Sequence, residues 1–150
     1  MEKMVHNRRY NTGTSDLLGS WINSSQEESS YFVEELYQKR SGEYFLYGKG
    51  GSNSRFAKQV RSQWLPGEKI VPLTWEEAKA WAEKHLSPED FEKHFGDISI
   101  TGERQTFAVY ISTGTIQQIR RSCAKSGKSM SAYIENLVWE DARKKTNNSA

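Results

Sequence analysis

The chain has 150 residues, a length that suits one ordinary domain or two small ones. Only 35% of the residues are hydrophobic, and no apolar run approaches the roughly 20 residues that a membrane-spanning helix needs. Aromatic residues reach 12%, and a fully disordered chain would be poor in them. We therefore expect a small folded protein with no membrane partner.

Positive charge is concentrated toward the C-terminus. Residues 1–100 contain 13 Lys and Arg against 15 Asp and Glu, whereas residues 101–150 contain eight against four. The C-terminal third is therefore the better candidate to meet nucleic-acid phosphate. The N-terminus has no apolar core of a secretory signal, and Cys123 has no second cysteine with which to form an intrachain disulfide. Both features favour a cytoplasmic location.

Alternating apolar and polar residues predict strands in the first half of the chain. Residues 32–38 alternate, Ser41-Gly42 is a turn dipeptide, and the aromatic run 43–47 follows, which together predict a β-hairpin. Residues 16–22 predict an earlier strand that pairs with it. The glycine-rich segment 48–52 is expected to end the sheet.

Two helices are predicted after these strands. Thr74 is a favourable N-cap with Glu77 at the capping-box position, and the helix should run from Trp75 to about Leu86. Its apolar stripe is expected to include Trp75, Ala78 and Ala82. A second short helix is predicted from Pro88 and its neighbouring acids, ending at Gly96.

The first half therefore reads as a small α+β domain over residues 9–96, with a three-stranded sheet covered by two helices. Residues 97–103 are expected to form a linker that could add an edge strand. Residues 1–8 and 146–150 are expected to be frayed ends.

A basic and aromatic cluster lies in the middle of the chain. It could form a nucleic-acid patch, but a short amphipathic helix with a solvated basic face is the favoured interpretation. Its residues are Lys49, Arg55, Phe56, Lys58, Arg61 and Trp64. The segment 48–52 resembles half a phosphate loop and is interpreted as a flexible loop.

No residue pattern in the chain predicts catalysis. His85 and His94 have neither cysteines nor carboxylates at the spacing of metal ligands, so we expect no metal site. No nucleophile, base and orienting group belong together in the sequence. We expect a protein that is not an enzyme and carries no cofactor.

The C-terminal third begins with a strand pattern. Over residues 105–111, Phe107, Val109 and Ile111 face one side of the predicted strand. The residues between them, Thr106, Ala108 and Tyr110, face the other side.

Two helices follow this strand. The first is capped by Ser112 or Thr113, carries a stripe of Ile116, Ile119 and Cys123, and ends at Gly127. The second is capped by Ser129 or Ser131. Its broad apolar face contains Tyr133, Ile134, Leu137, Val138 and Trp139.

This order of elements resembles a known family. A strand, a helix, the turn Gly-Lys-Ser-Met-Ser and a second helix look like the ribbon-helix-helix (Arc/MetJ-like) family, and residues 127–134 are similar to its signature. The resemblance covers residues 104–145 and implies a β-α-α dimerisation and DNA-binding domain. One strand and two helices bury too little surface alone, and a lone strand has two unpaired edges, so an obligate homodimer is expected.

The resemblance implies a role for each matching residue. The paired strands would enter the major groove of double-stranded operator DNA, and the amides at the start of the second helix would hold a phosphate. The expected DNA-binding residues are Arg104, Thr106, Ala108, Tyr110, Lys125, Lys128, Ser129, Met130 and Ser131. The expected dimer core is Phe107, Val109, Ile111, Ile116, Ile119, Ile134, Leu137 and Val138.

The chain departs from the family at the outward face of the strand. Ribbons that read bases usually carry Arg, Lys, Asn or Gln there, whereas this chain has Thr106, Ala108 and Tyr110. Either the strand recognises DNA bases only weakly, or the module serves only for dimerisation.

A looser resemblance concerns residues 10–12, 17–21 and 35–51. These segments are similar to a small domain on phage and plasmid proteins of Gram-positive bacteria, among or beside anti-CRISPR proteins. The leading hypothesis is a dimeric DNA-binding protein of a phage or plasmid, a transcriptional repressor or autorepressor in a bacterial host cell. The alternative is an anti-CRISPR inhibitor whose N-terminal domain binds a CRISPR effector, with the C-terminal module for dimerisation or autoregulation. An antitoxin is less favoured, because the chain ends about five residues after the module.

Overall fold

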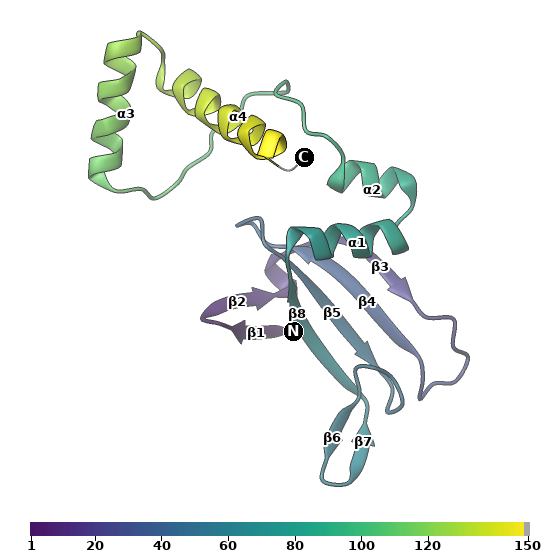
Figure 1. The fold of residues 1–150 in the computed structure, drawn as a ribbon. Helices are drawn as coiled ribbons and strands as arrows, with labels where there is room; N and C mark the ends of the chain where they lie inside the picture. Colours follow the sequence, from purple (N-terminus) through teal and green to yellow (C-terminus); the bar gives the residue numbers. More distant parts are fainter. Residues whose placement is uncertain (149–150) are drawn as a thin grey trace. The chain divides into compact units, whose positions relative to one another are not determined.

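The computed structural model describes residues 1–148 and is an α+β structure with four helices and several small antiparallel sheets. Contacts divide the chain into two compact units, Met1–Asp97 and the residues from Ile98 onward. All of the strands described belong to the first unit, and α3 (Thr113–Ser126) and α4 (Met130–Asn148) belong to the second (Figure 1). We call them unit 1 and unit 2.

The main sheet of unit 1 has four antiparallel strands in the order β3-β4-β5-β8. β3 (Asp16–Ile22), β4 (Phe32–Gln38) and β5 (Tyr44–Gly50) confirm the predicted strand and hairpin. The prediction of three strands is wrong, because β8 (Gly67–Leu73) pairs with β5 along its whole length. β8 contains Pro72, which argues against a central strand but is tolerated here because β8 is an edge.

The glycine-rich segment does not end the sheet where we expected. β5 continues through Gly48 and Gly50, both of which pair with β4 and with β8, and the ring of Phe56 packs directly against the Gly48 backbone. A Cβ atom at Gly48 would lie 2.0 Å from that ring, so only glycine allows the approach.

The first residues of the chain are folded rather than frayed. β1 (Glu2–Val5) and β2 (Arg8–Asn11) form a hairpin whose two turn residues, His6 and Asn7, have φ of 48° and 64°. Two consecutive left-handed residues are what a tight hairpin turn requires, and Asn tolerates that conformation well. The 3₁₀ turn η1 (Thr12–Thr14) follows.

The amphipathic helix predicted for the basic and aromatic cluster is wrong, because Lys58, Arg61 and Trp64 lie in a hairpin and the rest of the cluster lies in β5 or in the turn before that hairpin. β6 (Lys58–Val60) pairs with β7 (Gln63–Leu65), and Arg61 in the turn has φ of 56°. Every residue of both strands is exposed. Each strand has only three residues, which is too short for a pattern of alternating apolar and polar residues to be recognised. The turn depends on the positive φ of Arg61, which the sequence does not indicate.

The two predicted helices of unit 1 are confirmed. α1 (Trp75–His85) begins with a complete capping box between Thr74 and Glu77, and α2 (Pro88–Phe95) begins at the Ser87 cap. Trp75 is 49% exposed, so it does not join the buried stripe of Ala78 and Ala82.

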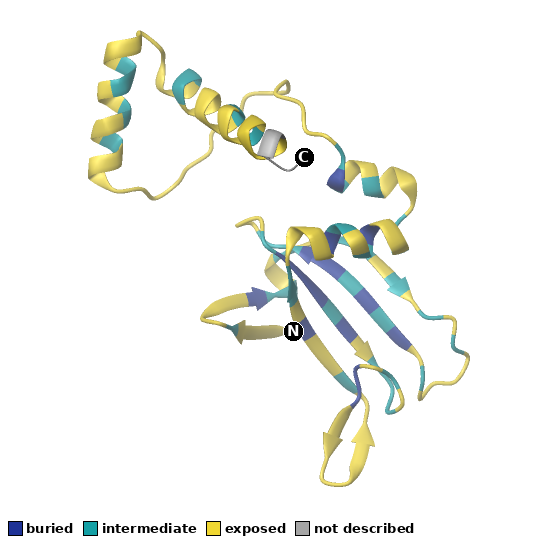
Figure 2. Ribbon diagram, viewed as in Figure 1, coloured by how far each residue is buried: buried dark blue, intermediate teal, exposed yellow. Residues whose placement is uncertain are grey.

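Unit 1 has a core on each face of its sheet (Figure 2). The helices cover one face, and the β1–β2 hairpin places Tyr10 on the other, 5.5 Å from the ring of Phe45. The helix-side core consists of Leu36, Tyr44, Leu46, Ala78, Ala82 and Phe95. The opposite core consists of Tyr10, Tyr37, Phe45 and Ile70.

Removal from water shifts the pKa of ionisable side chains in unit 1, among them the partly buried His85 and the buried Tyr37. Burial, then the adjacent Lys84 and Arg55, lowers the pKa of His85, whose ring is 4.2 Å from that of Trp21. Burial and the neighbouring Glu35 carboxylate raise the pKa of Tyr37 to about 12.

Candidate nucleic-acid interface

Both helices of unit 2 begin where the sequence indicated, and the first also ends there. The second continues to Asn148, so the prediction of a frayed end from residue 146 is wrong for residues 146–148. α3 (Thr113–Ser126) is capped by Ser112, whose Oγ accepts a hydrogen bond from the amide of Thr115 at 3.1 Å. Gly127 adopts a left-handed φ of 75°, and its amide donates to the carbonyl of Cys123 at 2.8 Å. A glycine in this conformation terminates a helix at little steric cost.

α4 (Met130–Asn148) begins directly after this turn. The Oγ of Ser129 accepts a hydrogen bond from the amide of Ala132 at 3.2 Å, so Ser129 is the cap. The amides of Met130 and Ser131 have no intrahelical acceptor, as at the start of any α-helix. Three of the residues expected to hold phosphate therefore form one helix start, where the helix dipole also favours an anion.

Residues 103–112, which include the predicted strand, form no strand within the described chain. A strand is defined by a backbone partner, and the expected partner of this segment is the same segment of a second copy. A single chain therefore cannot form the ribbon. Ile98 and Ile100 add no edge strand either.

Unit 2 has no buried residue among positions 98–146 (Figure 2). Phe107 is 86% exposed, and Leu137 and Val138 of α4 are 47% and 57% exposed. The two α3 residues of the expected dimer core, Ile116 and Ile119, are partly buried. The other expected core residues are also exposed, namely Val109, Ile111 and Ile134.

Some of the predicted residues line a common groove of about 440 Å³ within unit 2. Phe107 and Val109 line it from the strand segment, and Ile134 lines it from α4. Ser131, from the predicted phosphate site, also borders the groove. The segment of residues 100–109 therefore lies along the first turns of α4, with apolar side chains facing an open space.

Arg104 forms an ion pair that the sequence did not predict. Its Nη1 lies 3.4 Å from Oε1 of Glu135, and both side chains are at least half exposed. Such a pair is worth little in water, so Arg104 remains available to a stronger anion. Glu135 has an ordinary helical surface position, and nothing in its spacing marks it as a partner.

The residues predicted to face DNA are all accessible. Thr106, Ala108 and Tyr110 are exposed, with Tyr110 completely so. Lys125 lies in the last turn of α3, and Lys128 follows Gly127 in the turn between the helices. Both lysines are exposed, and neither side chain has an ion pair within the described residues.

Comparison with protein-family models, with curated proteins and with solved structures finds no match to this chain. In the part of the chain that the structure describes, no helix is both long and apolar enough to span a membrane. Across the same residues, no three His, Cys, Asp or Glu side chains gather as metal ligands would.

Proposed function

We propose that the protein is a homodimeric DNA-binding protein that uses residues 104–145 as a ribbon-helix-helix module and represses transcription from an operator. One observation carries the proposal: unit 2 exposes its apolar side chains and has no buried residue among positions 98–146. Two well-capped helices with exposed Leu137 and Val138 need a partner surface to be stable.

A second copy of the same chain is the partner that fits these features. Pairing two copies of residues 105–111 antiparallel would satisfy one edge of each strand and turn Phe107, Val109 and Ile111 toward the four helices. The apolar residues of α4 would close the same core. A shared core of this kind exists only in the dimer, so its stability would depend on protein concentration.

The opposite side of that ribbon supplies the DNA contact. Antiparallel pairing would place Thr106, Ala108 and Tyr110 of both copies on the outer surface, and a two-stranded ribbon fits the major groove. Phosphates on either side would meet the free amides of Met130 and Ser131 and the side chain of Lys128. Thr and Tyr can donate hydrogen bonds to bases, but neither makes the bidentate contacts of Arg or Asn.

The direct experiment is binding of the full chain to DNA from its own promoter and to scrambled DNA, at two salt concentrations. Affinity should fall steeply with salt, because phosphate contacts dominate. Lys128→Ala should weaken binding to both DNAs alike and reduce the salt slope by about two, because each of the two copies in the variant dimer neutralises one phosphate fewer. Tyr110→Ala should change the preference for the promoter.

Lys93→Ala provides a matched control, because Lys93 is an exposed lysine in the last turn of α2, in unit 1. It should leave DNA affinity unchanged. If the full chain binds promoter DNA no better than scrambled DNA, the module only dimerises. The origin in a phage or plasmid and a CRISPR effector as partner remain expectations from the resemblance of unit 1.

A further inference from the structure

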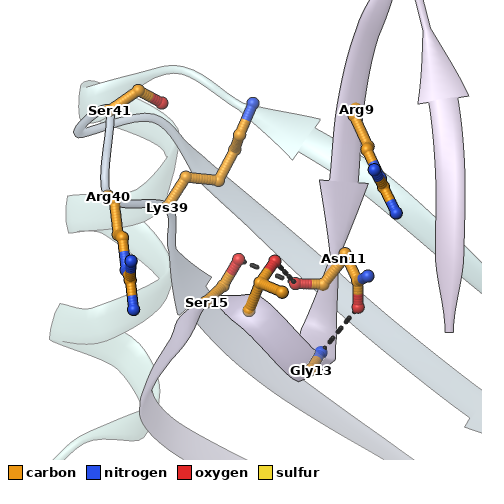
Figure 3. Close-up of a pocket in the computed structure, with 8 residues that line it drawn as sticks. Arg9, Asn11, Gly13, Ser15, Lys39, Arg40 and Ser41 are labelled. Carbon is orange, nitrogen blue, oxygen red and sulfur yellow. Dashed lines mark hydrogen bonds between the residues drawn. The ribbon is translucent and has the colours of Figure 1, made fainter.

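A basic pocket lies in unit 1, separate from every residue proposed above to bind DNA. Its volume is about 350 Å³, and it opens between the β2–η1 segment and the turn that joins β4 to β5 (Figure 3). Its lining consists of Arg9, Asn11, Gly13, Thr14, Ser15, Lys39, Arg40 and Ser41. Three of these are cations, four others carry a hydroxyl or an amide, and none is acidic or apolar.

Three cations from two separated segments meet at this pocket because the hairpin folds back. The β1–β2 hairpin packs on the sheet through Tyr10, which brings Arg9 beside the Lys39–Ser41 turn. Lys39 is fixed from two directions: its Nζ is 4.5 Å from the Tyr10 ring centroid and 3.2 Å from Oε2 of Glu43. In Figure 3, Arg9 and Arg40 flank the space above Asn11 and Gly13.

Acidic groups next to the pocket compensate only part of this charge. Glu2 pairs with Arg9 at 2.7 Å, and Glu43 pairs with Arg8 and Lys39 at 3.0 and 3.2 Å. The two segments, residues 1–16 and 38–43, hold five Lys and Arg against Glu2, Asp16 and Glu43, which leaves two positive charges besides the chain's terminal amine. These ion pairs hold the cations in place without neutralising the site.

Arg40 is the pocket cation without a partner. Its side chain forms no ion pair or hydrogen bond within the described residues, and it projects from an exposed turn. Arg9 retains donors beyond the one directed at Glu2, because a guanidinium has five. Two guanidinium groups with spare donors can bind several oxygens at once. A phosphate offers more such oxygens than a single carboxylate does, so it is the better ligand for this pair.

We propose that this pocket binds a phosphate group. The hydroxyls of Thr14 and Ser15 donate to the carbonyl of Asn11, at 3.4 and 2.8 Å, so they shape the floor, and the Arg and Lys side chains supply the donors. The phosphate could belong to a free phosphorylated small molecule, for which 350 Å³ is adequate, or to a nucleic-acid backbone. The proposal does not depend on how unit 2 functions.

The test is backbone amide NMR of the full chain with three probes: inorganic phosphate, adenosine monophosphate and a short single-stranded oligonucleotide. Chloride at equal ionic strength controls for screening. The amides of Gly13, Ser15 and Ser41 should shift with at least one probe and not with chloride. Arg40→Gln should weaken that binding about tenfold, as expected for removal of a charge-assisted hydrogen bond.

Arg61→Gln is the matched control, since Arg61 is also an exposed turn arginine of unit 1 outside the pocket. Shifts caused by phosphate or the mononucleotide and reduced by Arg40→Gln support a free phosphorylated ligand. Shifts caused only by the oligonucleotide, and reduced in the same way, support a nucleic-acid backbone. The pocket does not bind phosphate if no probe shifts these amide signals more than chloride does. The same conclusion follows if Arg61→Gln weakens binding as much as Arg40→Gln. Lys128→Ala reports separately on the proposed DNA contact of unit 2.

Discussion

The two units of this chain differ in whether they bury their apolar residues. Unit 1 buries Leu36 and Phe45 completely and has a core on each face of its sheet. Unit 2 has two longer helices, each with a serine N-cap, yet no buried residue at positions 98–146. Helix capping and local pattern are therefore sufficient to define helices, but a core requires surfaces that a single copy of unit 2 does not supply.

The two units should differ in how their unfolding free energy depends on protein concentration. Unit 1 should unfold with a free energy that does not depend on protein concentration, because its core is made within one chain. If unit 2 dimerises as proposed, it should become more stable as concentration rises, because its core would form between copies. Changes in each unit can separate the two behaviours.

Phe45→Ala should have the largest effect, lowering the stability of unit 1 by about 3–5 kcal/mol. The ring is fully buried and stacks on Tyr37 at 5.3 Å, so its removal leaves a cavity. Denaturant unfolding followed by Trp fluorescence measures the change. Val71→Ala, at a 41% exposed position of the same sheet, should cost far less, and equal losses for both variants would argue against this core.

Leu137→Ala should weaken the proposed dimer by about 2–5 kcal/mol, because the side chain that is 47% exposed in the single chain would become buried in the pair. Unit 1 should keep its unfolding midpoint. Equilibrium sedimentation over a range of concentrations gives the dissociation constant. An unchanged constant would remove Leu137 from the interface.

Thr74→Ala should destabilise unit 1 by about 1 kcal/mol, because it removes the cap and one half of the capping box of α1. The matching change in unit 2, Ser129→Ala, removes the cap that accepts from Ala132. It should lower the concentration-dependent stability by a similar amount and leave unit 1 unchanged. Thermal unfolding at two protein concentrations distinguishes the two responses.

The smallest effect should come from pH and should be confined to unit 1. Burial lowers the pKa of His85 below its ordinary 6.5, so the folded state binds fewer protons than the unfolded state just below that pH. Stability should therefore fall as pH falls from about 6.5 through the lowered pKa. His85→Gln should reduce this dependence, as measured by denaturant midpoints at several pH values. Unit 2 contains no histidine in residues 98–150 and should lack the effect.

Sequence reasoning predicted elements wherever the determining interaction is local. The Thr74–Glu77 capping box and the left-handed Gly127 each act within four residues, and both helices that they bound are present. The hairpin of β4 and β5 followed from alternation and the Ser41-Gly42 turn. Such signals need no knowledge of the rest of the fold.

The errors occurred where distant contacts or positive φ angles decide the structure. β8 was missed because Pro72 obscures its pattern and its pairing with β5 spans a long separation. The hairpins at residues 2–11 and 58–65 depend on left-handed His6, Asn7 and Arg61, which no alternation reveals. The basic pocket was missed for the same reason, since Arg9 and Arg40 are adjacent only once the first hairpin folds back.

For the candidate interface, the sequence predicted the helix start and the exposed basic side chains, whereas the strand predicted over residues 105–111 is not present in the single chain. The sequence did not identify the Arg104–Glu135 pair, because both residues are ordinary surface charges separated by 31 positions. The proposed ribbon would involve two chains, so a single chain cannot display it.

The claim that residues 104–145 form a dimer interface is tested most directly by sedimentation of the wild-type full chain and of the Leu137→Asp variant under the same conditions. The wild-type protein should sediment as a dimer at micromolar concentrations, whereas the variant, with a charge in the shared core, should sediment as a monomer that retains folded unit 1. A monomeric wild type, or a variant that remains dimeric, would contradict the assignment of residues 104–145 as the dimer interface.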